Sequence, residues 1–145
     1  MNLFTIGFTQ KSAKDFFETL NKSGAKRVLD IRLNNVSQLA GFTKKHDLEF
    51  FLNSICGIEY VHLPLLAPTQ EILDDYRKRK GSWASYEQRF LHLMEERNIK
   101  DDLGLDLISD SCLLCSEAKP DRCHRRLIAE HLQSIWNEID IYHLQ

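Results

Sequence analysis

The alternation of short apolar segments with amphipathic helical patterns is the feature that most constrains this chain. The predicted strands are residues 3–6, 27–32, 58–63, 111–115 and 139–143. Strands that alternate with helices form right-handed βα units around a parallel sheet. The sequence therefore predicts an α/β fold, a Rossmann-like three-layer α/β/α sandwich with a mostly parallel sheet of about five strands.

Helical spacing and capping residues place helices between these strands. Ser12 is a predicted N-cap and Gly24 a predicted stop for the first helix, and Thr43 is a predicted cap for the second. Further helices are expected over residues 69–80, 82–97 and 121–136, whereas residues 98–110 fit no single pattern. Two helices thus separate the third strand from the fourth, and we expect them to project as a helical hairpin.

The length, net charge and cysteine content of the chain exclude several classes of protein. The length of 145 residues suits one domain, which we place at residues 1–145. A net charge of −2 disfavours a general nucleic-acid-coating protein. The four cysteines are too sparse for a secreted disulfide scaffold, and the sequence shows no signal peptide or membrane-spanning segment. We therefore expect a cytoplasmic location and no membrane partner.

Polar and reactive side chains gather where the predicted strands end. In open parallel sheets, ligands bind outside the carboxyl ends of the strands, where the strand order changes direction. The residues at or beside these ends include Thr9, Asp30, Arg32, Tyr60, His62, Cys115 and Glu117. Their common position predicts that the functional site lies at this edge of the sheet.

Several motifs together resemble a known family. They are Thr5-Ile6-Gly7, Asp30-Ile31-Arg32, Gly57-Ile58-Glu59-Tyr60 with His62 and Pro64, and Leu113-Leu114-Cys115-Ser116-Glu117 followed by Pro120 and Cys123-His124-Arg125. On these residues, over nearly the whole chain, the sequence resembles domain-of-unknown-function family 488. The resemblance implies an α/β sandwich of this size and implies no reaction. Two motifs depart from the family pattern: Ile6-Gly7-Phe8-Thr9 replaces Ile-Gly-His-Ser, and Leu65-Leu66-Ala67 replaces Leu-Gly-Gly.

The loop after the fourth strand carries the most reactive set of side chains. Cys123 is expected in the first turn of a helix, where the helix dipole lowers a thiol pKa. Cys115, Glu117 and Cys123 are therefore candidate catalytic residues, with His124 and Arg125 as candidate ligands for a bound molecule. In the structural alternative, His124 bonds to a strand carbonyl, and Glu117 with Arg125 holds a packed turn.

Zinc is the sharpest alternative interpretation of the cysteines, because Cys112, Cys115, Cys123 and His124 look like four ligands. We expect Cys112 and Cys115 to point to opposite faces of their strand. We also expect Cys123 and His124 to diverge by roughly 100° on a helix. These directions argue against a metal site, and we predict none.

Two other enzyme classes are disfavoured. A phosphatase-like or rhodanese-like loop needs backbone donors between a cysteine and an arginine, but the segment from Cys115 to Arg122 contains Glu117 and Pro120. A dinucleotide-binding loop needs a Gly-x-Gly-x-x-Gly pattern, and the first loop offers only Gly7. A nicotinamide cofactor is therefore not expected.

The second and third strands supply the remaining candidates. Asp30 and Arg32 share one face of the second strand. Either they form a buried ion pair, or the Arg32 guanidinium binds a phosphate or carboxylate with two hydrogen bonds. Tyr60 and His62 also share a face, and His62 is a candidate for acid–base chemistry. The basic run at residues 77–80 ends a helix, where a solvated cap is favoured over an anion contact.

These observations predict an enzyme that binds an anionic small molecule, a nucleotide or phosphorylated metabolite, at the carboxyl edge of the sheet. The predicted catalytic residues are Cys115, Glu117, Cys123 and His62, and the predicted ligand-binding residues are Arg32, Arg125, Asp30, Tyr60, His124 and Thr9. The cofactor stays open. The alternative is a non-catalytic module that senses a nucleotide or contacts nucleic acid, the less favoured partner.

These assignments carry geometric expectations. One pocket is expected to be lined by Arg32, His62, Glu117 and Arg125. An anion is expected where residues 116–121 enter the following helix, because helix N-termini attract anions. Lys119, Arg122 and Arg125 are expected to add cations there, and Arg32 to approach from the neighbouring strand end.

The four cysteines are expected to divide into two pairs. Cys115 and Cys123 should lie close together, with a disulfide if their Cα atoms are within about 7 Å. Cys56 and Cys112 should be buried and inert.

Overall fold

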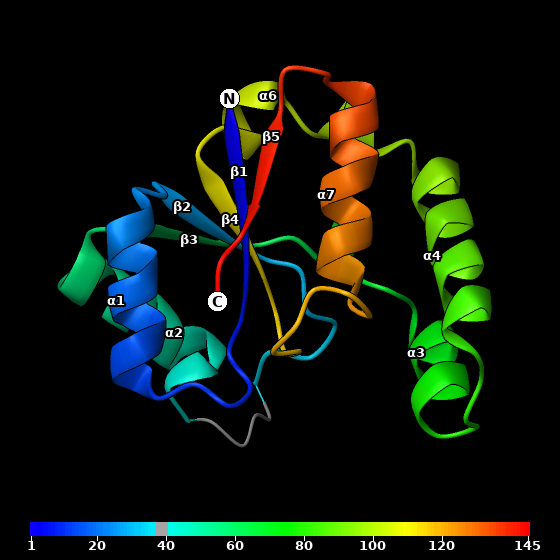
Figure 1. The fold of residues 1–145 in the computed structure, drawn as a ribbon, viewed down its shortest axis with the longest axis horizontal. Coiled ribbons are helices and arrows are strands. Elements are labelled where there is room, and N and C mark those ends of the chain that lie inside the picture. Colours follow the sequence, from blue (N-terminus) through cyan, green and yellow to red (C-terminus); the bar gives the residue numbers. More distant parts are fainter. Residues whose placement is uncertain (37–40) are drawn as a thin grey trace.

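The structure is a computed structural model that describes residues 1–36 and 41–145, so part of the polar segment before Gly41 lies outside the described residues. Five parallel strands form one sheet in the order β3-β2-β4-β1-β5 (Figure 1). The strands are β1 (Asn2–Gly7), β2 (Arg27–Asp30), β3 (Glu59–His62), β4 (Ser111–Cys115) and β5 (Asp140–His143). The predicted strands and the α/β class are confirmed.

Helices cover both faces of this sheet (Figure 1). They are α1 (Ala13–Ser23), α2 (Lys45–Phe51), α3 (Gln70–Arg77), α4 (Trp83–Arg97), α5 (Ile99–Asp102), α6 (Leu105–Ile108) and α7 (His124–Ile135). On one face, α1 and α2 bury Phe16 and Leu48, and on the other α4 and α7 bury Phe90 and Ile128. No helix within the described residues is long and apolar enough to cross a membrane. The three-layer arrangement is thus confirmed.

The predicted helix caps are mostly confirmed. Ser12 Oγ accepts a hydrogen bond from the Asp15 N–H at 3.1 Å, and Gly24 ends α1 with a φ of 79°. The cap predicted at Thr43 is wrong. Thr43 is buried in a 3-10 turn, and α2 follows Lys44, which makes no side-chain cap bond.

The start predicted for the last helix is also wrong, and this matters for the site. The helix was expected from Asp121, but the Cys123 N–H donates to the Pro120 carbonyl at 3.2 Å and closes a turn first. α7 therefore begins at His124, with Cys123 as an extended N-cap at φ −139°. The stretch 98–110, which fitted no pattern, forms α5 and α6.

The strand order opens a crevice at the carboxyl end of β4. This strand lies between β1 and β2, whose connections lead to α1 and α2 on one face of the sheet. The connection after β4 leads instead to α7 on the other face. Where neighbouring strands send their chains in opposite directions, their ends are left open to a ligand. Cys115, the last residue of β4, lies at this point.

Candidate functional site

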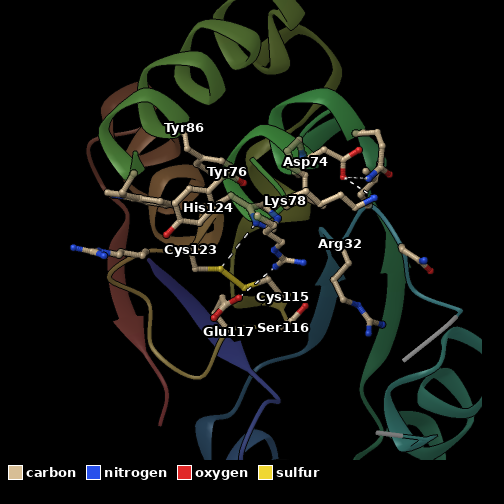
Figure 2. Close-up of a pocket in the computed structure, with 18 residues that line it drawn as sticks. Arg32, Asp74, Tyr76, Lys78, Tyr86, Cys115, Ser116, Glu117, Cys123 and His124 are labelled. Carbon is tan, nitrogen blue, oxygen red and sulfur yellow. Dashed lines mark hydrogen bonds and ion pairs between the residues drawn. A yellow bond between two sulfur atoms is a disulfide. The ribbon is translucent and has the colours of Figure 1, made fainter. Parts of the chain in front are cut away.

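A pocket of about 360 Å³ lies over this crevice (Figure 2). Its walls come from the loop after β2, from α3, from the first turn of α4 and from the β4–α7 loop. The volume falls within the range of small-molecule sites in proteins. The site thus lies at the edge that the sequence predicted, but α3 and α4 add a wall that the prediction did not include.

The inner end of the pocket holds Cys115, Cys123 and His124 (Figure 2). The two cysteines are buried and form a disulfide, which confirms that they lie close together, with Cα atoms 7.6 Å apart. His124 Nδ1 lies 4.0 Å from Cys123 Sγ. The two cysteine Sγ atoms and a ring nitrogen of His124, which are all potential metal ligands, lie within 4.8 Å of one another.

The expected divergence of Cys123 and His124 is wrong. The expectation placed both residues inside a helix, but Cys123 is an extended N-cap, so its side chain turns toward His124. The expectation for Cys112 is confirmed: it is buried in the core on the opposite face, and burial raises its thiol pKa. The expectation that Cys56 would be buried is wrong, because it is only half-buried.

His124 also makes the contact that its structural alternative predicted. Its Nε2–H donates to the Ile31 carbonyl at 2.7 Å, and its ring meets Phe90 edge-on at 5.5 Å. Burial lowers the pKa of His124 to about 4, so the ring is neutral near pH 7. With Nε2 as the donor, Nδ1 keeps its lone pair and faces the cysteines.

Arg125 supports the loop rather than lining the pocket, so this part of the pocket prediction is wrong. The residue is fully buried, and its guanidinium donates to the carbonyls of Glu117 and Ala118 and, at 3.2 Å, to Cys115 Sγ. Burial lowers the pKa of Arg125 to about 10, which leaves it charged near pH 7. Among the described residues no carboxylate lies within 4.0 Å of this cation.

Gly7 makes this arrangement possible. A Cβ at Gly7 would lie 2.6 Å from the Glu117 carbonyl carbon and 2.8 Å from Arg125 Nη1. The end of β1 can therefore pass under the loop only without a side chain. Thr9 continues the contact, because its N–H donates to the Ser116 carbonyl at 3.0 Å, but its exposed side chain does not line the pocket.

Asp30 and Arg32 form the buried ion pair that was one of the two interpretations. Arg32 Nε and Nη2 each lie 2.8 Å from an Asp30 oxygen, and Nη2 also donates to the Thr43 carbonyl at 2.7 Å. Burial alone would raise the pKa of Asp30, but the bonds from Arg32 and Tyr60 outweigh it and hold this pKa below its usual value. Tyr60 Oη donates to Asp30 at 2.6 Å, and burial together with this bond raises its own pKa.

The predicted site residues lie on two different faces of the sheet rather than around one pocket. Tyr60 packs in the core on the α1–α2 face, whereas Cys115 and Cys123 pack on the α7 face. Arg32 borders the pocket, but its side chain points away from the cysteines (Figure 2). His62 donates from Nε2 to the Arg32 carbonyl at 3.2 Å and does not line the pocket, so the prediction that it would is wrong.

The cations that do reach the pocket come mainly from elements whose role the sequence left open. Arg77 and Lys78, at the end of α3, line it together with Arg122 from the β4–α7 loop. Arg77 pairs with the half-exposed Glu117 at 3.3 Å, and Lys78 with Asp74 at 3.6 Å. Arg122 is exposed, and no carboxylate of the described chain lies within ion-pair distance of it.

Aromatic side chains complete the wall, and sequence reasoning missed them as site residues. Tyr76, Trp83 and Tyr86 line the pocket, with Trp83 stacked on Tyr86 at 4.9 Å and edge-on to Tyr76 at 5.6 Å. Tyr86 also packs into the core, since it is only 5% exposed. A base or sugar ring can stack against such a surface.

A comparison with protein families matches residues 12–132 to a family described as Domain of unknown function DUF488. The chain belongs to this family. The predicted resemblance is therefore confirmed. Neither the curated proteins nor the solved structures contain a match to this DUF488 chain.

Proposed function

We propose that this DUF488 chain is an enzyme that binds an anionic small molecule in the pocket at the carboxyl edge and acts on it through Cys115. The observation that carries the proposal is the contact between the buried Arg125 guanidinium and Cys115 Sγ at the inner end of the pocket. The proposal applies to the reduced protein, in which Cys115 is a thiol. It includes a single domain over residues 1–145 and a cytoplasmic location, where cysteines stay reduced.

The electrostatics of Arg125 support a reactive Cys115. A buried guanidinium without a carboxylate partner is costly, and carbonyl oxygens supply only partial negative charge. A thiolate at Cys115 would provide the missing counter-charge, and the 3.2 Å contact would stabilise it. Thiolates are the nucleophilic form of cysteine. Cys115 is therefore the proposed nucleophile, and the half-exposed Glu117, which also lines the pocket, is the proposed group for proton transfer.

The pocket walls support an anionic and partly aromatic ligand. Arg77, Lys78 and Arg122 offer three cations, against which Asp74 and Glu117 set two carboxylates. The surplus cation favours a phosphate, and the adjacent rings of Tyr76 and Trp83 suit a base. A nucleoside monophosphate combines both groups and suits the volume.

Calorimetry on the reduced protein tests the binding step, with AMP as the probe and adenosine as its uncharged control. AMP should bind measurably better than adenosine. A double variant, Arg77→Gln with Arg122→Gln, should weaken AMP binding roughly tenfold or more, since each lost charged hydrogen bond costs about 1.5–3 kcal/mol. Lys80→Gln is the matched control, because Lys80 belongs to the same basic run and does not line the pocket. Absence of binding by AMP and by ribose 5-phosphate at millimolar concentration would refute the proposal.

Alkylation tests the chemical step. Iodoacetamide should modify Cys115 faster than Cys56, and bound AMP should slow the modification of Cys115 but not that of Cys56. Peptide mass spectrometry locates the modified residue. If AMP binds while Cys115 reacts no faster than Cys56, the chain is the alternative non-catalytic nucleotide-sensing module.

A further inference from the structure

We infer that, in the reduced protein, Cys115 Sγ, Cys123 Sγ and His124 Nδ1 bind a divalent transition-metal ion of the zinc class. Its fourth coordination position would face the pocket. This inference goes beyond the proposed function and does not depend on an anionic ligand. In the metal-bound form Cys115 is a ligand, so the nucleophilic role proposed for it belongs to the reduced, metal-free protein, on which the alkylation test is run.

The positions of the three ligand atoms suit such an ion. They lie within 4.8 Å of one another, and Cys123 Sγ is 4.0 Å from His124 Nδ1. A tetrahedral zinc ion takes sulfur at about 2.3 Å and nitrogen at about 2.0–2.1 Å, which sets its ligands roughly 3.5–3.8 Å apart. Reduction breaks the bond between the two sulfurs and lets them move apart to this spacing, while His124 Nδ1 needs only a small approach to Cys123 Sγ.

The backbone spacing of the cysteines points the same way. Their Cα atoms lie 7.6 Å apart, whereas disulfide-bonded cysteines usually lie within about 6.8 Å. An ion held between two sulfurs separates them more than a direct bond does, so it suits the wider spacing. The disulfide and the ion compete for the same sulfur atoms, and only the reduced pair can bind the ion.

Contacts around these ligands match those found at metal sites. Metal-bound histidines usually donate their second ring N–H to a carbonyl or carboxylate, which fixes the ring orientation. His124 does this toward the Ile31 carbonyl at 2.7 Å, leaving Nδ1 as the free acceptor. The Arg125 contact to Cys115 Sγ likewise favours the thiolate form that binds metal.

The ligand set and its exposure indicate the type of metal site. Two thiolates and one imidazole are soft and borderline donors, which favour zinc over magnesium or calcium. Structural zinc sites have four protein ligands, whereas catalytic sites have three and leave one position for water or substrate. Cys115, Cys123 and His124 all border the pocket, so a bound anion can reach that fourth position.

Cobalt titration of the full chain tests the inference. The protein is reduced with a phosphine, freed of metal and titrated with Co²⁺ in the absence of any nucleotide. We expect one equivalent to bind, with a near-ultraviolet thiolate-to-cobalt band that Zn²⁺ abolishes. Cys123→Ser should remove about half of the band and weaken Zn²⁺ binding by more than the roughly 10–100-fold that loss of a second-shell contact costs. Cys56→Ser is the matched control and should change neither.

X-ray absorption of the zinc-loaded wild-type protein gives a readout that does not depend on the variants folding. A first shell with two sulfur donors and one imidazole supports the site, and a shell of oxygen or nitrogen alone overturns it. A cobalt band that keeps its full intensity in Cys115→Ser, or wild-type protein that takes up no ion after reduction, also overturns it. Because no nucleotide is present, these outcomes leave the AMP proposal to its own test.

Discussion

Replacing Gly7 with alanine tests the close approach on which the β4–α7 loop depends. The new Cβ would lie 2.6 Å from the Glu117 carbonyl carbon, closer still to its oxygen, and 2.8 Å from Arg125 Nη1. Two of these obstacles are backbone atoms, so no side-chain rotation relieves the overlap. The end of β1 and the loop must separate by more than about 1 Å, and overpacking of this kind costs about 1–3 kcal/mol.

The separation also weakens the hydrogen bond from Arg125 to the Glu117 carbonyl, and a hydrogen bond to a charged group contributes about 1.5–3 kcal/mol. We therefore expect Gly7→Ala to lower the free energy of unfolding by about 3 kcal/mol, which corresponds to a fall in Tm of about 10 °C for a chain of this size. Urea titration followed by circular dichroism measures both variant and wild type.

Gly41→Ala is the matched control. A Cβ at Gly41 would meet no atom of residues 1–36 and 41–145 within 4 Å. It should therefore change stability by no more than about 1 kcal/mol, and toward stabilisation, because alanine restricts the unfolded chain. If Gly7→Ala also stays within about 0.5 kcal/mol of wild type, the proposed contact between β1 and the loop is refuted.

Three further predictions concern charge and capping. Asp30→Asn should cost about 3–5 kcal/mol at pH 7, because it leaves Arg32 buried and unpaired. Because the pKa of Asp30 is lower in the folded protein than its unfolded value of about 3.9, its ionised form stabilises the fold at pH values above about 4. The free energy of unfolding should therefore fall as the pH drops below about 4, and it should fall less steeply in Asp30→Asn. Denaturant titrations between pH 2 and 7 measure the free energy of unfolding of both proteins. The same pH dependence in wild type and Asp30→Asn would contradict the prediction. Arg125→Leu should destabilise by about 3 kcal/mol or more in urea, because it removes the charged hydrogen bonds to the carbonyls of Glu117 and Ala118. The exposed Arg122→Leu should stay within about 0.5 kcal/mol, and equal effects would show that the buried contacts of Arg125 do not matter. Ser12→Ala should cost about 1 kcal/mol in thermal unfolding, and no change would exclude its cap bond as a contributor.

Local signals predicted the fold well because each acts over a few neighbouring residues. Ser12 and Gly24 bound α1 through hydrogen bonding and backbone conformation that depend on nearby chain alone. The start of α7 was mispredicted because a turn closed by Pro120 and Cys123 competes with the first helical turn, and periodicity does not register such a turn. Thr43 failed as a cap because it is buried in a 3-10 turn before α2.

The candidate site was predicted less completely, because it combines distant segments. Polar residues at the strand ends indicated the correct edge, since parallel strands end on the same side. The sequence did not show which face of the sheet each of these polar side chains would occupy. In the structure Asp30 and Tyr60 lie on the face opposite Cys115. Arg77 and Trp83 were missed as site residues because only the folding of α3 and α4 over the crevice brings them to Cys115.

The sequence by itself determined the parallel sheet, its helical layers, the DUF488 membership and the placement of Cys115 at a strand end, because periodicity and motifs are local properties of the chain. The tertiary structure decided what these residues contact. It buried Arg125 against Cys115, paired Arg32 with Asp30, and turned Cys123 toward His124. Side-chain direction and burial depend on which segments pack together, and residues meeting at this crevice come from segments more than ninety positions apart.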